Sequence, residues 1–174
     1  MRNVKIFVLY LLENINYPLD FTTINDIVMQ TDYVMYLDFA EAFNEMVDMH
    51  LIDKFEDNGK ELYLITDRGR IVARELKSDL LTSMLDKSLA QALRYLDFKK
   101  RNIVSRCTVE RTDDGRYRIT ATFTEKGVCI FSQSLVVDTE NRAERMRDNF
   151  HDRPEVIYRG VVALMAGNVN YLFD

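Results

Sequence analysis

The stretch from Leu51 to Ile65 constrains the fold more than any other part of the chain, because it predicts a β-hairpin. Asn58-Gly59 lies at its centre, and a two-residue type I′ turn needs positive φ at both central positions, which Asn and Gly tolerate best. Reversal about this pair places Asp57 opposite Lys60, Glu56 opposite Glu61, Phe55 opposite Leu62 and Asp53 opposite Leu64. Burial of one face then fixes the register. We expect the buried face to carry Leu51, Phe55, Leu62 and Leu64, and the other face to carry Lys54, Glu56, Glu61 and Tyr63.

Three helices are predicted before the hairpin. Residues 3–16 carry apolar side chains at helical spacing, and Pro18 ends that helix. Thr22 or Thr23 caps the second helix, and Thr31-Asp32 forms the turn after it. The third helix spans roughly residues 34–49. Its outward residues are Asp38, Glu41, Asn44, Glu45 and Asp48.

A long helical pattern follows the hairpin. Thr66 is the expected N-cap, and Gly69 lies one turn in, where a missing side chain allows close packing. The pattern then continues almost unbroken to about Asn102, with a bend near Ser78-Asp79 as an alternative. A helix of this length needs a surface to cover, either a second domain of the chain or a second copy of it. Its apolar stripe consists of Leu81, Leu85, Leu89, Ala92 and Leu96.

The last part of the chain predicts a three-stranded antiparallel sheet and two helices. Residues 103–111, 116–125 and 128–137 alternate between apolar and polar side chains. Turns that contain Gly115 and Gly127 separate the three strands. The apolar strand faces include both cysteines, Cys107 and Cys129, so we expect two buried, reduced thiols.

Two N-cap motifs predict where the two helices after the sheet begin. Thr139 is the expected N-cap of the first, whose apolar stripe is Ala143, Met146 and Phe150. Asp152-Arg-Pro-Glu155 predicts a capping box with proline in the first turn of the second. These helices cover the apolar face of the sheet.

The predicted elements combine into an α+β protein. We expect a winged helix-turn-helix domain over residues 1–77, a connecting and dimerisation helix over residues 78–102, and a C-terminal α+β domain over residues 103–174. No stretch approaches the roughly 20 apolar residues of a membrane span. We therefore expect no membrane partner. The reduced thiols favour the cytoplasm, and the apolar stripe of the long helix favours a homodimer.

Three short motifs carry a family resemblance. They are Phe43-x-x-Met46-x-x-x-His50-Leu51-Ile52, the Asn58-Gly59 turn, and Leu64-Ile65-Thr66-x-x-Gly69-Arg70. They resemble motifs of bacterial winged-helix regulators, except that His50 stands where glycine is usual. Over essentially its full length the chain is similar to the domain-of-unknown-function family numbered 4364, small proteins that pair a winged helix with a C-terminal α+β segment. The resemblance implies this fold and a regulator-like role, and it brings no known site residues.

Charge is unevenly distributed along the chain. Residues 1–56 carry three basic and ten acidic side chains, whereas residues 57–111 carry 12 basic and eight acidic ones. There is no Lys or Arg between Leu19 and Asp53. Because affinity for duplex DNA comes largely from neutralised phosphates, this balance argues against docking of the third helix in the major groove.

The candidate DNA-binding residues fall into two groups. Tyr33, Tyr36 and Asn44 belong to the third helix and its start, and the alternative for the tyrosines is packing against Pro18. The wing and the helix after it contribute Lys54, Lys60, Arg68 and Arg70, for which the alternative is solvated surface. If the chain binds duplex DNA, we expect the contacts to come from the wing. If it does not, the acidic third helix becomes a docking face for a basic protein partner.

Other candidate sites have simpler explanations. Lys99-Lys100-Arg101 lies at the end of a helix, where the helix dipole favours cations. Arg116, Arg118 and the threonines of the middle strand suit an exposed strand face. His50 and His151 have no metal-ligand spacing with cysteine, and no catalytic or phosphate-loop motif is present. We therefore expect no enzyme activity, no metal and no cofactor.

The sequence favours one function over two alternatives. The favoured function is a transcriptional-regulator-like winged-helix protein with a C-terminal dimerisation or sensing domain. One alternative is a winged helix that serves as a protein–protein interaction module without binding DNA. The other is a small-molecule sensor that uses the C-terminal sheet, and it is compatible with either.

Overall fold

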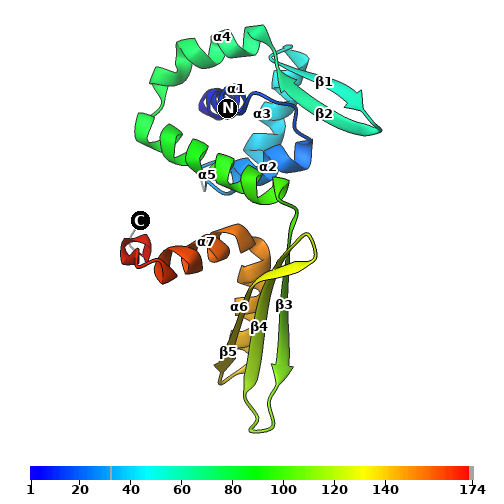
Figure 1. The fold of residues 1–174 in the computed structure, drawn as a ribbon. Helices are drawn as coiled ribbons and strands as arrows, with labels where there is room; N and C mark the ends of the chain where they lie inside the picture. The colour runs from blue at the N-terminus through cyan, green and yellow to red at the C-terminus, as the bar shows by residue number, and fades with distance from the viewer. Residues whose placement is uncertain (32, 173–174) are drawn as a thin grey trace. The chain divides into compact units, whose positions relative to one another are not determined.

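The computed structural model describes residues 1–31 and 33–172, and the chain forms two compact units, Met1–Tyr95 and Leu96–Asp174. Of the turn predicted at Thr31-Asp32, Asp32 lies outside the described residues. The first unit contains α1 (Arg2–Ile15), α2 (Phe21–Met29), α3 (Tyr36–Asp48), β1 (Ile52–Asp57), β2 (Lys60–Ile65), α4 (Asp67–Leu76), the short 3₁₀ helix η1 (Lys77–Asp79) and most of α5 (Thr82–Lys100). The second contains β3 (Ile103–Arg111), β4 (Tyr117–Glu125), β5 (Val128–Val137), α6 (Glu140–Asp152), α7 (Pro154–Met165) and the 3₁₀ helix η2 (Val169–Leu172). This order confirms the predicted α+β class (Figure 1).

None of the helices in the described part of the chain is both long enough and apolar enough to span a bilayer.

The hairpin has the predicted register but the opposite buried face. Phe55 pairs with Leu62, Glu56 with Glu61 and Asp57 with Lys60, and Asn58 and Gly59 have φ of 50° and 75°. The buried face, however, carries Ile52, Tyr63 and Ile65. Phe55 on the other face is 39% exposed, and Leu62 and Leu64 are half-buried. The predicted apolar face was therefore wrong for Phe55, Leu62 and Leu64, whereas Leu51, just before β1, is buried as predicted.

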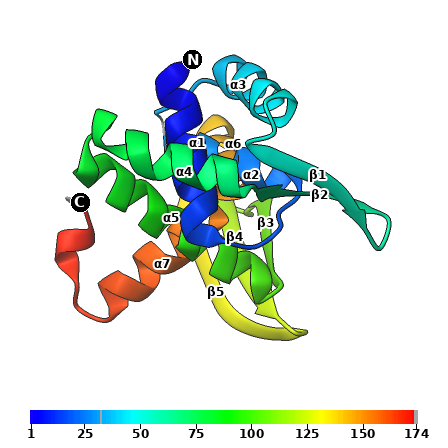
Figure 2. The same cartoon turned by 90° about the horizontal axis from the view of Figure 1, so that it is seen from above.

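Tyr63 explains why that face turns inward. Its backbone N–H donates to the Leu19 carbonyl at 2.8 Å, and its carbonyl accepts from the Leu19 N–H at 3.1 Å. Its ring meets that of Phe43 edge-on, with the ring centroids 5.0 Å apart. The segment before α2 and one face of α3 thus hold the base of the hairpin, while its tip projects beyond the helices (Figures 1 and 2).

The end of α3 and the start of α4 meet at one hydrogen-bonded junction. His50 has φ of 54°, the left-handed region that favours glycine, which accounts for glycine being usual at this position. The Thr66 hydroxyl donates to the His50 carbonyl at 2.9 Å and accepts from the Gly69 N–H at 3.0 Å, as predicted for the N-cap. A Cβ on Gly69 would lie 2.2 Å from the Leu51 carbonyl oxygen, so the close packing predicted there is confirmed.

An aromatic cluster forms the centre of the first unit. Phe21 lies 5.6 Å from Phe39 and 5.1 Å from Phe43, centroid to centroid. Because Phe21 packs in this cluster, α2 begins at Phe21 and its N-cap is Asp20, whose carboxylate accepts from the Thr23 N–H at 2.8 Å. The predicted cap at Thr22 or Thr23 was wrong, and Thr23 instead donates its hydroxyl to Asp20.

The helical pattern from Thr66 to about Asn102 is divided in two at the bend that the sequence offered as an alternative near Ser78-Asp79. α4 ends at Leu76, η1 follows, and Leu80 is extended with its side chain 8% exposed. Burial of Leu80 therefore coincides with the break. In α5 the predicted stripe is buried at Leu85, Ala92 and Leu96, whereas Leu81 is 75% exposed.

The second unit is an antiparallel sheet, in the order β3-β4-β5, with α6 packed on one face (Figure 1). Its core cluster consists of Cys107, Ile119, Phe123, Val137, Ala143 and Phe150. A register shift beside Phe123 pairs Cys129 with Thr124. Cys129 is therefore exposed, which corrects its predicted burial, whereas Cys107 is buried as expected.

α7 has no side-chain cap at its start and exposed apolar residues at its end. Asp152 is the last residue of α6, and α7 starts after Arg153 without a side-chain cap, so the predicted capping box does not form. The second half of α7 is apolar but exposed, with Val162 48% and Met165 82% accessible.

The junction at Gly69 yields a prediction about stability. Gly69→Ala should lower the free energy of unfolding by about 1–3 kcal/mol, because the new methyl group collides with the Leu51 carbonyl oxygen. Gly59→Ala is the matched control: its Cβ meets nothing within 4 Å, and only the positive φ opposes it, at about 1 kcal/mol. Urea unfolding of both variants measures the difference. A Gly69→Ala variant as stable as the wild type would contradict the described junction.

Candidate functional site

The outward face of α3 is a single exposed stripe. Leu37, Glu41, Asn44 and Asp48 follow one another at spacings of four, three and four, which places them on one side of the helix, and all are exposed. Asp38 flanks the stripe and is exposed too. Glu45, also predicted to face outward, is half-buried and forms an ion pair with Lys5. Apart from this pair, the surface of α3 is as acidic as predicted.

The three candidate DNA-binding residues of this region are in different environments. Tyr33 packs against Phe7, with the ring centroids 5.2 Å apart, and is 41% exposed. Tyr36 is the first residue of α3 and is 54% exposed. Asn44 is exposed in the middle of the stripe. Tyr36 and Asn44 are therefore accessible to a partner, whereas one side of the Tyr33 ring packs against the core residue Phe7.

The wing lysines differ in their electrostatic partners. Lys54 forms an ion pair with Glu61. The Glu61 carboxylate also accepts a hydrogen bond from the Tyr63 hydroxyl. The hydrogen bonds from Lys54 and Tyr63 hold the pKa of Glu61 below its usual range. Burial, and then the hydrogen bond to Glu61, raises the pKa of Tyr63 to about 12. Among the described residues, Lys60 at the turn makes no ion pair.

Arg68 and Arg70, two residues apart in α4, have different surroundings. Arg68 is exposed, and no described carboxylate forms an ion pair with it. Arg70 is half-buried and donates from Nη2 to the Asn16 side-chain oxygen at 2.7 Å. Arg70 is therefore engaged with the end of α1 and is less available to a partner than Arg68.

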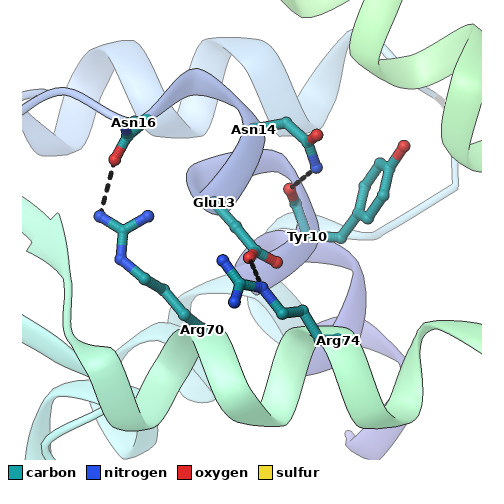
Figure 3. A network of polar contacts seen from close by, with 6 residues as sticks. All are labelled: Tyr10, Glu13, Asn14, Asn16, Arg70 and Arg74. Carbon is teal, nitrogen blue, oxygen red and sulfur yellow. Dashed lines mark hydrogen bonds and ion pairs between the residues drawn. The ribbon is translucent and has the colours of Figure 1, made fainter.

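A polar cleft of about 570 Å³ lies between the C-terminal end of α1 and α4 (Figure 3). Its lining consists of Tyr10, Glu13, Asn14, Asn16, Arg70, Arg74 and Lys77. Glu13, whose side chain is only 13% exposed, pairs with Arg74. The Asn14 side chain donates to the Tyr10 carbonyl at 2.8 Å, and Asn16 has a φ of 58°. Burial, and then the charge of Asp86, raises the pKa of Tyr10.

The contacts in this cleft primarily hold α4 against α1. The C-terminal end of a helix carries partial negative charge, so the arginines of α4 are favourably placed beside the end of α1. The cleft was not predicted from the sequence. The only available signal was the spacing of Arg70 and Arg74, one helical turn apart, and that spacing does not identify the element that they face.

The second unit offers a smaller polar groove along α6. It measures about 450 Å³ and is lined by Thr139, Asn141, Arg142, Arg145, Met146 and Asn149. On the sheet, Thr120 lies within 3.4 Å of Ser134, and Arg116 pairs with Asp114. Arg101, from the basic cluster at the end of α5, makes two hydrogen bonds of 3.0 Å to Glu125. Two of the predicted basic candidates are thus partnered within the unit.

Neither histidine belongs to a metal-binding cluster. No group of three His, Cys, Asp or Glu side chains within residues 1–31 and 33–172 is arranged to hold a metal ion. His151 instead packs edge-on against Phe150, with the ring centroids 5.8 Å apart.

Comparison with known proteins places the chain within a family. Residues 4–165 match the family described as Domain of unknown function (DUF4364). No curated protein and no solved structure matches the chain.

The raised pKa of Tyr63, which burial and then the hydrogen bond to Glu61 cause, predicts a dependence of stability on alkaline pH. The pKa of Tyr63 is about 12 in the folded protein and about 10 in the unfolded chain, so the unfolded chain loses this proton first as pH rises. The stabilisation is complete below pH 10 and disappears between about pH 10 and 12. Relative to Tyr63→Phe, the wild type should lose up to about 1.4 kcal/mol per pH unit in that window.

Urea unfolding at about pH 9 and about pH 11 tests this expectation. Tyr36→Phe is the matched control, because Tyr36 is 54% exposed and its hydroxyl makes no described contact with a carboxylate. Parallel pH profiles for the wild type and Tyr63→Phe would contradict it.

Proposed function

We propose that this chain, which belongs to the DUF4364 family, is a non-catalytic winged-helix protein of the transcriptional-regulator type that binds duplex DNA through its wing. The arrangement of α1, α2, α3 and the hairpin carries the proposal. The hairpin is joined to the segment before α2 by the Leu19–Tyr63 backbone pair, and its tip projects (Figure 2). A projecting two-stranded ribbon beside an exposed helix matches the way in which winged helices contact a duplex.

The DNA contacts in this proposal are few and mainly to phosphates. Lys60 at the tip of the wing and Arg68 at the start of α4 make no described ion pair, so their charges are available to phosphate groups. Lys54 contributes less because Glu61 already pairs with it. The acidic stripe on α3 repels phosphates, so this helix does not enter the major groove.

We further propose that the protein is a homodimer held by the exposed end of α7. From the sequence we expected the contact on the helix of residues 78–102, but the apolar stripe of that helix is buried at Leu85, Ala92 and Leu96.

From Gly160 to Phe173 the sequence contains no charged residue. Val162 and Leu164, which are 48% and 37% exposed, lie on different sides of α7, and Met165 is 82% exposed on the side of Val162. A helical segment that is apolar all round is normally buried. A second copy suits it because two uncharged, apolar surfaces meet without the repulsion that a net charge of −5 imposes elsewhere.

The reducing cytoplasm is the compartment that we propose for this protein. Cys107 and Cys129 are both free thiols, and neither takes part in a disulfide. Free thiols persist where glutathione and thioredoxin keep cysteine reduced.

The wing proposal predicts weak duplex binding with a shallow salt dependence. A bound dimer with two phosphate contacts per subunit makes about four contacts, instead of the six to ten of strong binders. Its slope in log affinity against log salt concentration is therefore about −4, or about −2 per subunit. Lys60→Ala and Arg68→Ala should each weaken binding and reduce that slope by about one per subunit. Glu41→Gln should strengthen binding by removing repulsion.

Fluorescence anisotropy with random and genomic duplexes at two salt concentrations measures these effects. Arg111→Ala is a matched control, because it removes an exposed cation from the end of β3 in the second unit. Absence of binding at low salt would overturn the wing proposal. Tight binding with a steep salt slope would instead require a basic surface assembled from other parts of the chain or from two copies.

The dimer proposal predicts that one exposed residue of α7 controls the mass in solution. The wild type should sediment at about twice the monomer mass of 20.5 kDa, and Met165→Glu should sediment as a monomer. Leu81→Glu is the matched control, since Leu81 is 75% exposed but lies before α5. A monomeric wild type at high micromolar concentration, or dissociation by Leu81→Glu alone, would overturn the assignment to α7.

A further inference from the structure

Three consecutive apolar side chains are exposed at the start of α3. Met35 is 75%, Tyr36 54% and Leu37 78% exposed, although the other side of the same helix is fully buried. Isolated exposed apolar residues are ordinary, but a contiguous group on the surface of a protein commonly marks an interaction site. Phe39 and Phe43 on the other side of α3 are the side chains that fill the core, so the three exposed residues are not needed to pack the helix.

The charges beside this apolar group indicate what kind of partner it fits. Glu41 and Asp48 continue the stripe that Leu37 begins, and Asp38 flanks it. Within the described part of the chain none of these three carboxylates forms an ion pair. The helix dipole accounts for Asp38 in the first turn, but it disfavours Asp48 in the last turn. Helix stability therefore does not explain the carboxylate at the C-terminal end of the stripe.

We propose that the exposed face of α3, with Leu37 as its apolar anchor and Glu41 and Asp48 as its charges, is a docking surface for a basic, amphipathic segment of another protein. The absence of Lys and Arg between Leu19 and Asp53 means that no cation on this part of the chain opposes such a partner. Apolar side chains of the partner cover Leu37 and Met35, and its lysines or arginines meet the carboxylates. A nucleic acid is excluded as the occupant because the same carboxylates repel its phosphates.

This surface shares no residue with the proposed DNA contacts. Lys60 belongs to the tip of the hairpin and Arg68 to α4, whereas the docking surface consists only of α3 and the residue before it. A partner bound to α3 therefore leaves both cations accessible. The protein can be tested for each activity separately.

The test uses the full chain and three labelled synthetic peptides. The first is an amphipathic helix with leucine on one face and lysine on the other, the second replaces lysine with glutamate, and the third replaces leucine with serine. We expect the lysine–leucine peptide to bind with a dissociation constant on the order of 10 μM, and the other two to bind at least about tenfold more weakly. Its binding should weaken as salt is raised.

Matched variants locate the binding surface. Leu37→Ser and the double variant Glu41→Gln, Asp48→Asn should each weaken binding of the lysine–leucine peptide by about fivefold or more. Leu81→Ser removes a leucine of nearly equal exposure, and the double variant Glu110→Gln, Asp113→Asn removes the same number of exposed carboxylates from the second unit. These two controls should leave the affinity unchanged. All of the substituted side chains are exposed, so the thermal melts should match that of the wild type.

Different variants should affect peptide binding and duplex binding, so the two proposals can fail separately. Lys60→Ala should not change peptide binding, and Leu37→Ser should not weaken duplex binding. The docking proposal is overturned if no peptide binds up to about 1 mM, if the glutamate peptide binds as well as the lysine peptide, or if the control variants lose as much affinity as the α3 variants.

Discussion

The contact that positions the rest of the first unit is the backbone junction between the end of α3, the start of β1 and the start of α4. The Leu51 carbonyl accepts the Thr66 N–H at 3.1 Å and lies against Gly69, while the Thr66 hydroxyl bonds the His50 carbonyl. These contacts close the hairpin at its base and set the direction in which α4 leaves it. Because α4 then packs on α1 through Arg70 and Arg74, the position of the wing relative to the helices depends on this junction.

Much of this fold was predictable because turn chemistry and periodicity are local properties. Asn58-Gly59 predicted the pairing of the hairpin, and Gly115 and Gly127 predicted the turns of the sheet, which have φ of 84° and 81°. The buried face of the hairpin was not predictable in the same way. Both faces carry apolar side chains, and the choice was made by Leu19 and Phe43, which are distant in sequence from the Tyr63 that they contact.

The remaining errors have the same physical origin. Periodicity does not register a single extra residue in a strand, so the shift beside Phe123 that exposes Cys129 was missed. Periodicity also left open whether the long helix is continuous or bent near Ser78-Asp79, and the structure has the break there, beside the buried, extended Leu80. Within the candidate site, the acidic face of α3 was predictable, because the charge of each residue and its position on a helix can be read from the sequence alone. The engagement of Arg70 with Asn16 was not, since it depends on how α4 packs against α1.

The cations proposed to meet DNA and the acidic stripe of α3 lie on different elements of the first unit, and this bears on how a winged helix can be used. In a strong DNA-binding protein the recognition helix and the wing both contribute cations, so the two contact surfaces act together. Here the wing and the start of α4 offer Lys60 and Arg68, which make no described ion pair, while α3 displays carboxylates beside Met35 and Leu37. A duplex and a basic protein are therefore not competitors for one surface. Binding of a basic partner to α3 would also neutralise the charge that repels phosphates, so the two proposed interactions should favour each other, and by linkage each should raise the affinity of the other by the same factor.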